Sequence, residues 1–493
     1  MTALEQDPRR WKALALLSVA YLMVVLDVSI VNVALPSIQK ELDFSTEDLQ
    51  WVVSGYALTF GGFLLLGGRL GDILGRRKLF MAGLALFAIC SLLCGLSVNS
   101  GMLITMRLLQ GAAGAILSPS VFSIVTVTFA EGSERNKALG ILGGIAGSGA
   151  AIGVLLGGVL TEYAGWEWIF FVNVPIGFAA LAFVPRLVRE SHAEGLARHF
   201  DASGAVTVTA SLMFLVYGLT QSTTNGWTSW KTIGALVLSG VLMAAFLTIE
   251  SRSRSPLVPL GFFRKRTPTG ANVIGFGLGT AIFGMFFLLS LYMQQVLGYS
   301  ALKTGVAYLT VALLAVVSSG AAQALVTRLG VRPVLASGMT LLGIGLVLFT
   351  QVSVGGSYVA DLLPGFILIG IGLGFAFVPV SIAALAGVTG GEAGLASGLI
   401  NTSQQIGGAL GLAILVTVST THTETLAKEG KSTAEALTGG FGLAFWVGAA
   451  FAAISVAATF LMLRREDLAM TTGATPEPAT AASSTGATAS PRS

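Results

Sequence analysis

The feature that most constrains this chain is a series of apolar segments, each long enough to cross a lipid bilayer. A membrane helix needs roughly 20 predominantly apolar residues, and that length finds about fourteen segments between residues 13 and 463. Inside a bilayer only helices and closed barrels satisfy every backbone polar group, so we predict an all-α integral membrane protein. The predicted spans lie near residues 13–35, 50–70, 79–98, 101–125, 137–160, 168–187, 203–221, 231–250, 270–296, 303–326, 332–351, 357–386, 393–419 and 440–463.

The composition excludes a soluble globular protein. Hydrophobic residues make up 54% of the chain and charged residues only 11%, against about 25% charged residues in a soluble domain. The net charge of +4 includes no long basic run, so nucleic acid is not an expected partner. Cys90 and Cys94 have no further metal ligands nearby, and we expect them to be packing residues. We predict no cofactor and no metal site.

The basic residues indicate the orientation of the chain in the membrane. With the loops numbered alternately, about 22 of the 28 Lys and Arg residues fall on one side and about five on the other. Cytoplasmic loops carry such an excess of Lys and Arg, so both termini are predicted to be cytoplasmic. The first apolar run continues to about Leu35, which is too long for the core of a signal peptide, and it is interpreted as a retained first span.

Two short patterns recur with a constant offset of eight predicted spans. The loops after spans two and ten share a Leu-Gly pair followed by Arg, in residues 74–77 and 329–332. Spans four and twelve share a Gly and a Pro five residues apart, at 114–119 and 374–379. The offset pairs spans one to six with spans nine to fourteen and leaves spans seven and eight as an inserted pair. Two repeated halves around a central pathway are typical of transporters.

We accordingly predict four regions along the chain. They are an N-terminal six-helix bundle (1–200), two inserted helices with a cytoplasmic linker (201–265), a C-terminal six-helix bundle (266–465) and a disordered cytoplasmic tail (466–493). The tail consists largely of Ala, Thr, Ser, Pro and Gly, a composition that cannot bury an apolar core.

Two ionisable residues within the spans are candidates for proton coupling. Asp27 in span one and Arg107 in span four are predicted to lie at similar depth in the outer half of the membrane. A carboxylate at that depth is costly unless it is paired or hydrated, and its proton affinity then depends strongly on its neighbours. Substrate and proton would compete for Asp27. The alternative is a static ion pair that only holds two helices together.

Other polar or small residues within the spans are candidates for a substrate cavity. Gln110 and Gly111 lie on one face of span four, and Asn401 and Gln405 lie on one face of span thirteen. Asn32 lies in span one. For the span-thirteen pair, the alternative is a set of interhelical hydrogen bonds, each contributing about 0.6 kcal/mol in a membrane.

Glycine patterns predict close packing in span five and a gate in the loop after span two. Gly149, Gly153 and Gly157 recur every fourth residue and give a smooth face for helix contact.

The chain contains no Walker sequence for binding ATP, so transport is expected to use an ion gradient. The predicted gating residues of the loop are Gly68, Asp72, Gly75, Arg76 and Arg77.

These motifs resemble the major facilitator superfamily, specifically the fourteen-span drug:H⁺ antiporters among bacterial multidrug and antibiotic exporters. The resemblance covers nearly all of residues 10–465. Four stretches carry it: Leu26–Pro36 in the first span, Gly68–Lys78 in the loop, Arg107–Gly111 in the fourth span and Trp168–Gly177 at the start of the sixth. Span five departs from the family motif, because Val154 follows Gly153 where proline is usual.

The resemblance implies the major facilitator fold, with two pseudo-repeated six-helix bundles and two inserted helices. It implies a proton-coupled antiporter that exports drug-like or antibiotic small molecules across the bacterial cytoplasmic membrane by alternating access. We expect a monomer whose partners are protons, a small-molecule substrate and the bilayer. A proton-coupled nutrient or metabolite symporter is the alternative, since a fold does not fix the direction of transport. A membrane-embedded enzyme is a third interpretation, but the clustered polar groups it would need are not found.

Overall fold

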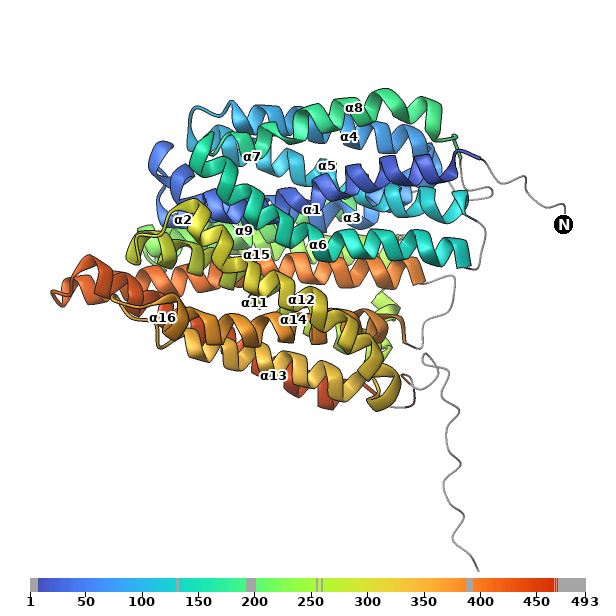
Figure 1. The fold of residues 1–493 in the computed structure, drawn as a ribbon. Coiled ribbons are helices and arrows are strands. Elements are labelled where there is room, and N and C mark those ends of the chain that lie inside the picture. Colours follow the sequence, from blue (N-terminus) through green and yellow to red (C-terminus); the bar gives the residue numbers. More distant parts are fainter. Residues whose placement is uncertain are drawn as a thin grey trace, which may run out of the picture.

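The apolar segments form long helices in the computed structural model of the chain (Figure 1). The structure describes residues 8–129, 133–191, 201–253, 256–258, 260–386, 393–464, 466 and 468. These residues include twelve helices that are long and apolar enough to cross a membrane, and no strand. The all-α prediction is therefore confirmed. Two further long helices, α3 and α6, lie where the sequence predicts spans two and five, so the structure is compatible with fourteen spans, a number that stays a prediction.

The described residues of the N-terminal half form eight helical segments. They are α1 (Arg10–Glu41), α2 (Thr46–Leu49), α3 (Trp51–Leu74), α4 (Arg76–Gly95), α5 (Ser100–Thr128), α6 (Ser133–Tyr163), α7 (Trp168–Phe171) and α8 (Asn173–Leu187). The last two are one predicted span that is interrupted at Val172. Pro175 explains the interruption, because it lacks the N–H that would bind the carbonyl of Phe171.

The remaining described chain forms the inserted pair and the C-terminal half. The inserted helices are α9 (Ala202–Asn225) and α10 (Trp230–Arg252). The C-terminal half contains η1 (Leu260–Arg264), α11 (Arg266–Leu291), η2 (Tyr292–Val296), α12 (Ala301–Leu329), α13 (Val331–Phe349), η3 (Tyr358–Leu362), α14 (Leu363–Leu385), α15 (Ala393–Lys428) and α16 (Thr433–Met462). The predicted tail, residues 466–493, lies outside the described residues apart from Glu466 and Leu468.

The two halves repeat the same packing scheme. In the N-terminal half α1 packs on α6 and α8, α3 on α5, and α4 on α5 and α8. The corresponding C-terminal pairs are α11 with α15 and α16, α12 with α14, and α13 with α14 and α16. Gly75 and Gly330 turn the chain at matching places with φ of 109° and 85°, a conformation that favours glycine. The repeat read from two short motifs is thus present throughout the fold.

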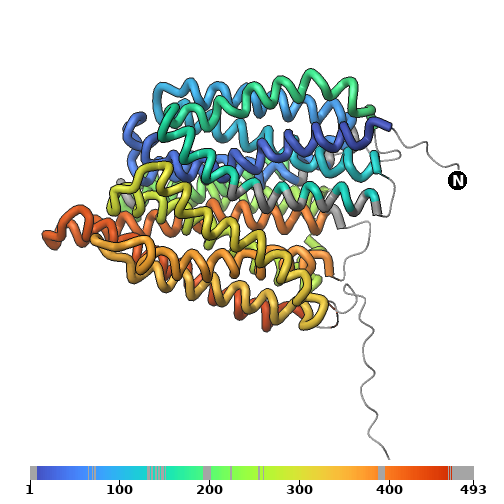
Figure 2. The backbone as a smooth tube through the Cα atoms, in the orientation of Figure 1, coloured from blue at the N-terminus to red at the C-terminus, as the bar shows by residue number. Residues whose placement is uncertain are grey.

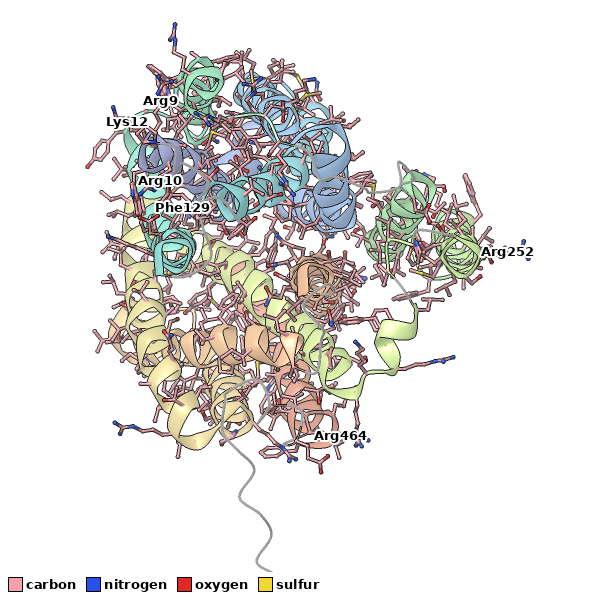
Figure 3. All side chains as sticks on the ribbon, turned by 90° about the vertical axis from the view of Figure 1, so that its right-hand side faces the viewer. Arg9, Arg10, Lys12, Phe129, Arg252 and Arg464 are labelled. Atoms are coloured by element: carbon pink, nitrogen blue, oxygen red, sulfur yellow. The ribbon has the colours of Figure 1, made fainter. Side chains whose placement is uncertain are left out.

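The halves meet mainly along three helix pairs, and the inserted pair packs beside this junction. The main contacts between the halves are those of α6 with α12, α3 with α15, and α1 with α11, and smaller ones join α1 to α12 and α2 to α15. The helix α9 packs on α3 and α15, whereas α10 packs mainly on α9. Viewed along the bundle, α9 and α10 form a separate green pair at one side (Figure 3). The Gln50 amide joins α9 to α3 by donating to Thr220 Oγ1 at 2.9 Å.

Three helices extend farther than their apolar segments predict. The helix α1 continues to Glu41, α15 continues to Lys428, and α16 begins at Thr433. The two extensions near residue 430 project beyond the rest of the bundle (Figure 2). The polar start of α16 is stabilised by a reciprocal capping box of Ser432 and Glu435. The length of an apolar segment predicts the part of a helix that faces lipid, but it does not predict how far the helix continues into water.

Candidate functional site

Asp27 and Arg107 form a buried ion pair inside the N-terminal half. Arg107 Nη1 lies 2.5 Å from Asp27 Oδ2, and each residue is only 1% exposed. They lie on α1 and α5, which cross here. The sequence placed both residues at similar depth, and the structure brings them into direct contact. A pair removed from water in this way interacts more strongly than a surface pair, but both ions lose their hydration.

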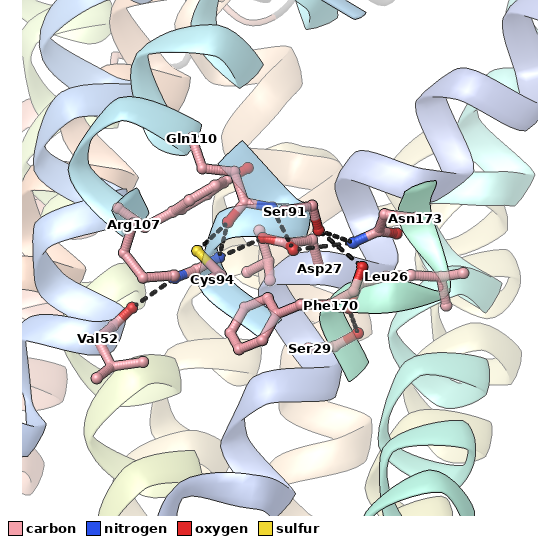
Figure 4. Close-up of polar contacts among 12 residues, drawn as sticks. Leu26, Asp27, Ser29, Val52, Ser91, Cys94, Arg107, Gln110, Phe170 and Asn173 are labelled. Carbon is pink, nitrogen blue, oxygen red and sulfur yellow. Dashed lines mark hydrogen bonds and ion pairs between the residues drawn. The ribbon is translucent and has the colours of Figure 1, made fainter. Parts of the chain in front are cut away.

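Two amides complete the hydrogen bonding of the Asp27 carboxylate (Figure 4). Gln110 Nε2 donates to Asp27 Oδ1 at 2.8 Å, and Asn173 Nδ2 donates to the same oxygen at 3.2 Å. Gln110 Oε1 also accepts from Arg107 Nη1 at 2.8 Å. The Gln110 amide therefore bridges the carboxylate and the guanidinium. Hydrogen bonds to an ionised group are stronger than neutral ones, so this arrangement stabilises the charged form of Asp27.

The interruption between α7 and α8 places Asn173 and the Phe170 carbonyl next to α4. Asn173 is the first residue of α8, and its Nδ2 also donates to Ser91 Oγ of α4 at 3.0 Å. Ser91 Oγ in turn donates to the carbonyl of Phe170 at 2.9 Å. Cys94, one turn along α4 from Ser91, places its Sγ 3.6 Å from Gln110 Oε1. The carboxylate is thus connected to α4, α5 and α8 through a continuous polar cluster.

Arg107 has additional partners on α3. Its Nε donates to the carbonyl of Val52 at 2.9 Å, and its guanidinium carbon lies 4.3 Å from the centre of the Tyr56 ring. A cation above an aromatic face is attracted by the ring quadrupole. The Tyr56 hydroxyl is buried and makes no hydrogen bond with the residues that the structure describes. Arg107 therefore keeps several interactions that do not depend on the charge of Asp27.

The residues predicted to form a substrate cavity lie in separate places. Gln110 belongs to the polar cluster around Asp27. Asn32 is buried and donates to Val28 and Ser29 carbonyls of its own helix. A side chain at Gly111 would meet the Tyr56 carbonyl and Thr59, so this glycine allows α5 to approach α3.

The two predicted cavity residues of α15 lie in different surroundings: Gln405 at the junction of the two halves, and Asn401 on an exposed face. Gln405 is half-buried, and its Cβ packs against Gly61 of α3. Asn401 is exposed, and its Nδ2 donates to the carbonyl of Ser397 one turn earlier. Both residues lie on α15, which packs against α3 of the other half. Their contact with substrate stays a prediction.

The three regularly spaced glycines of α6 face α1. A Cβ at Gly149 would meet Val25, one at Gly153 would meet Ser29, and one at Gly157 would meet Ile30. The ladder therefore packs against the same helix that carries Asp27. The absence of proline after Gly153 leaves α6 continuous from Ser133 to Tyr163.

The loop after α3 is tied to the segment that follows α8. The N–H groups of Arg77 and Lys78 donate to the Glu190 carboxylate at 3.0 and 3.2 Å, and the N–H of Arg76 donates to the Ser191 carbonyl at 3.0 Å. An acid at a helix N-terminus satisfies open N–H groups and the helix dipole. Glu190 therefore caps α4 from within the same half.

The predicted gating residues occupy this loop and the end of α3. Gly75 turns the chain between α3 and α4, and Gly68 faces Pro119 of α5. The side chain of Asp72 lies outside the described part of the structure. Arg76 and Arg77 belong to the first turn of α4, which Glu190 caps. A gating role for the loop stays a prediction.

The hydrogen bonds between the two six-helix halves gather at the end of the bundle where α1 terminates. Gln294 Nε2 donates to the Val33 carbonyl at 2.9 Å, and Gln295 Nε2 donates to Gln39 Oε1 at 2.7 Å. Both glutamines lie in η2, the π-helical continuation of α11. Nearby, Gly158 and Gly305 let α6 and α12 approach each other so closely that added Cβ atoms would meet backbone. The halves are closely joined at this end.

At the opposite end, where α1 begins, two basic side chains bind partners within their own half. We call this the basic end; Figure 3 looks onto it and labels Arg9, Arg10, Lys12, Arg252 and Arg464. Arg10 pairs with Glu134 at 3.0 Å within the N-terminal half. Arg332 donates to the Phe460 carbonyl within the C-terminal half. Between the halves, Thr402 Oγ1 donates to the Gly61 carbonyl at 3.1 Å.

Sequence reasoning missed several members of the polar cluster. Tyr56 and Ser91 were not singled out, and Asn173 appeared only within a family motif. Cys94 was interpreted only as a packing residue. The signal available in the sequence was that a polar or polarisable residue occurred on each of α3, α4 and α8, but nothing in one sequence shows which helices are neighbours. No group of three potential metal ligands occurs among the residues that the structure describes.

Comparisons with known proteins place this arrangement among transporters. Residues 17–412 match the family model described as Major Facilitator Superfamily. The puromycin resistance protein pur8 of Streptomyces alboniger is 39% identical over 437 residues, which cover 88% of this chain and 86% of that protein. The cephamycin export protein CmcT of Amycolatopsis lactamdurans is 39% identical over 412 residues, covering 83% and 84%.

A solved structure supports the same architecture. A bacterial homolog of the human lysosomal transporter Spinster, crystallised in an inward-facing and unoccupied conformation, superposes with a TM-score of 0.68. The match covers 94% of this chain and 98% of that one at 14% sequence identity. At this identity the likeness concerns the fold alone.

Proposed function

The chain belongs to the major facilitator superfamily, and on that premise we propose that it exports antibiotic-like small molecules in exchange for protons. The observation that carries the proposal is the buried Asp27 carboxylate, bound by Arg107, Gln110 and Asn173. The printed names of two relatives, a puromycin resistance protein and a cephamycin export protein, support export as the direction. A transporter family also argues against an enzyme.

Asp27 is the proposed site of the transported proton. When Asp27 is ionised, its two oxygens are fully engaged by one cation and two amides. When it takes up a proton, Arg107 loses its counter-ion but retains the Val52 carbonyl, the Gln110 carbonyl oxygen and the Tyr56 ring. These partners allow the guanidinium to stay in place while the proton comes and goes. The network then changes charge without a collapse of the helix packing.

Proton exchange requires a movement of the helices. Both members of the pair are almost completely enclosed, so water and protons do not reach them in this conformation. The halves are joined by hydrogen bonds at the end where α1 terminates, while at the other end Arg10 and Arg332 each bind a partner within their own half. Rocking of the halves would break the hydrogen bonds at the end where α1 terminates. The Asp27–Arg107 pair would then become accessible from that end. This is alternating access in a chain with repeated halves.

The basic end is proposed to face the cytoplasm. Lys and Arg are concentrated in the loops of that side, as the positive-inside pattern requires. The proposal therefore places both termini in the cytoplasm and the protein in the bacterial cytoplasmic membrane. We propose that it acts as a monomer, because each half already provides the packing that a transport cycle needs.

Transport in everted membrane vesicles tests the proposal. Vesicles acidified inside should accumulate puromycin when they contain the parent protein, because export from the cell corresponds to uptake by an everted vesicle. Asp27→Asn should abolish the part of uptake that a protonophore removes. Asp48→Asn, which changes an exposed acid on α2, is the matched control and should transport normally.

The same assay separates the competing interpretations. A symporter would release its substrate from vesicles that are acidic inside, since protons and substrate would then leave together. A static Asp27–Arg107 pair predicts that Asp27→Asn lowers the amount of folded protein but leaves the coupling of the remaining protein intact. Proton-driven uptake at the parental level per folded Asp27→Asn molecule would exclude Asp27 as the coupling group.

A further inference from the structure

An apolar groove runs along the surface between α1 and α8, on the half of these helices next to the basic end. It has a volume of about 570 Å³. Its lining residues are Lys12, Ala15, Leu16, Val19, Pro175, Ile176, Ala179, Ala180, Phe183 and Leu187. This groove shares no residue with the polar cluster.

Residue size creates the groove. Small side chains, Ala15 on α1 and Ala179 and Ala180 on α8, leave space between the two helices. Larger apolar side chains such as Val19 and Phe183, which are 45% and 52% exposed, form its walls. The α8 residues from Pro175 to Leu187 extend over about 18 Å at 1.5 Å rise per residue. That length matches the hydrocarbon of one leaflet, which is about 15 Å thick.

The mouth of the groove at the basic end is positively charged. Lys12 is exposed and lines the groove itself. Arg9 lies one turn before Lys12 and donates from Nη1 to the carbonyl of Arg186, which lies one residue before the groove residue Leu187. Figure 3 shows Arg9 and Lys12 together at this end, beside α1 and α8. Acidic side chains do not occur among the groove residues.

We propose that this groove binds one acyl chain of an anionic phospholipid, whose headgroup phosphate is held by Lys12 together with Arg9. An apolar slot as long as one leaflet fits an acyl chain, and the basic mouth complements a phosphate at the level where headgroups lie. A neutral phospholipid would fill the slot equally well but would gain less at the mouth. The proposal concerns an anionic lipid and not a soluble anion, because the groove beneath the basic mouth is apolar along its length.

A lipid bound in the groove would contact the two helices that carry Asp27 and Asn173. The helices α1 and α8 also carry Asp27 and Asn173, which are hydrogen bonded to each other deeper in the membrane. An acyl chain between the two helices would support their separation and thereby the distance between these side chains. The lipid is therefore inferred to act as a structural ligand of the half that contains the polar cluster.

Native mass spectrometry of the full-length protein tests the site. The purified parent is mixed with equal amounts of dioleoyl phosphatidylglycerol and dioleoyl phosphatidylcholine, and the lipid retained on the protein is counted. Lys12→Gln should reduce retention of the anionic lipid about fivefold, as expected for the loss of one Lys near an anionic headgroup. Arg252→Gln, which removes an exposed charge from the basic end of α10, should leave retention unchanged.

A second pair of variants tests the acyl slot. Ala179→Trp should fill the groove and reduce retention of both lipids, whereas Ala244→Trp on the exposed face of α10 should not. Retention of the two lipids in equal amounts by the parent would overturn the anionic preference. Equal loss in Lys12→Gln and Arg252→Gln would overturn the headgroup site, and unaltered retention in Ala179→Trp would overturn the groove. Lys12 is exposed, so its variant keeps the test valid even if Ala179→Trp folds poorly.

Discussion

The two halves use one packing scheme but fill matching positions with opposite chemistry. The loop glycines align Cys94 of α4 with Phe349 of α13, and the Gly–Pro motifs align Arg107 of α5 with Ile367 of α14. In the N-terminal half this level holds the polar cluster. In the C-terminal half it holds a chain of ring contacts that links Phe286, Tyr308, Phe366, Phe349 and Phe445.

This difference teaches that the fold does not require the charges. Aromatic pairs contribute about 0.5–1.5 kcal/mol beyond the burial of their area, whereas a buried ion pair must first offset the loss of hydration of both ions. The C-terminal half shows that the same helices pack well around apolar rings. We infer that Asp27 and Arg107 serve transport. The aromatic cluster is inferred to keep the C-terminal half rigid.

Removing Arg107 should have the largest effect, because its partner Asp27 is buried. Arg107→Ala leaves Asp27 buried without its cation, and the loss of one partner of a buried pair costs about 3–5 kcal/mol. We expect a lower midpoint of thermal unfolding and no proton-driven uptake in everted vesicles. Ile367→Ala, at the aligned position of the other half, which is exposed there, should retain coupled uptake. Normal coupling in Arg107→Ala would contradict the role of the pair.

A double variant separates stability from coupling at the same site. Asp27→Asn combined with Arg107→Gln removes both charges and leaves two neutral amides in their place. It should recover part of the thermal stability that Arg107→Ala loses, because no unpaired ion is buried, but proton-driven uptake should stay absent. Recovery of coupled uptake would show that the polar cluster only holds the helices together.

Disrupting the aromatic cluster should lower the stability of the protein but leave its proton coupling intact. Phe349→Ala creates a cavity beside Phe366 and Phe445, and such a change costs about 3 kcal/mol or more. The midpoint of thermal unfolding should fall, while uptake per folded molecule should keep the parental dependence on pH. A changed pH dependence in Phe349→Ala would mean that the C-terminal half contributes directly to proton coupling.

Removing one amide from the carboxylate should have a moderate effect. Asn173→Ala deletes the hydrogen bond to Asp27 Oδ1 and also the one to Ser91. A hydrogen bond to a charged group contributes about 1.5–3 kcal/mol, and a carboxylate that loses a donor holds its proton more readily. The pH dependence of uptake should therefore move toward alkaline pH. Ser91→Ala, which leaves the Asn173–Asp27 contact in place, should move it less.

The smallest effect is expected at the junction of the halves. Gln294→Ala and Gln295→Ala each delete one hydrogen bond between η2 and α1, and each such bond contributes about 0.6 kcal/mol in a membrane protein. Spin labels placed across this end should show a larger population of separated halves, with little loss of stability. Identical label distances in parent and double variant would show that these contacts do not stabilise the closed end.

The sequence predicted the class of the fold and the central pair of the site. Apolar length located the helices, and the constant offset of two motifs predicted the repeat that the packing shows. Asp27 and Arg107 were recognisable because a charge is costly within an apolar span. Helix ends were predicted less well where polar caps continue a helix into water, as they do around Ser432.

Only the tertiary structure decided which polar residues share a site. Gln110 and Asn173 meet at one oxygen of Asp27 although they lie 63 positions apart. Asn401 and Gln405 share one helix, yet Asn401 binds within its own helix and Gln405 packs on α3. The physical reason is that hydropathy is a property of each segment alone. A hydrogen bond between spans depends on which helices are neighbours and on how each is rotated, and every contact within the bundle takes part in setting both.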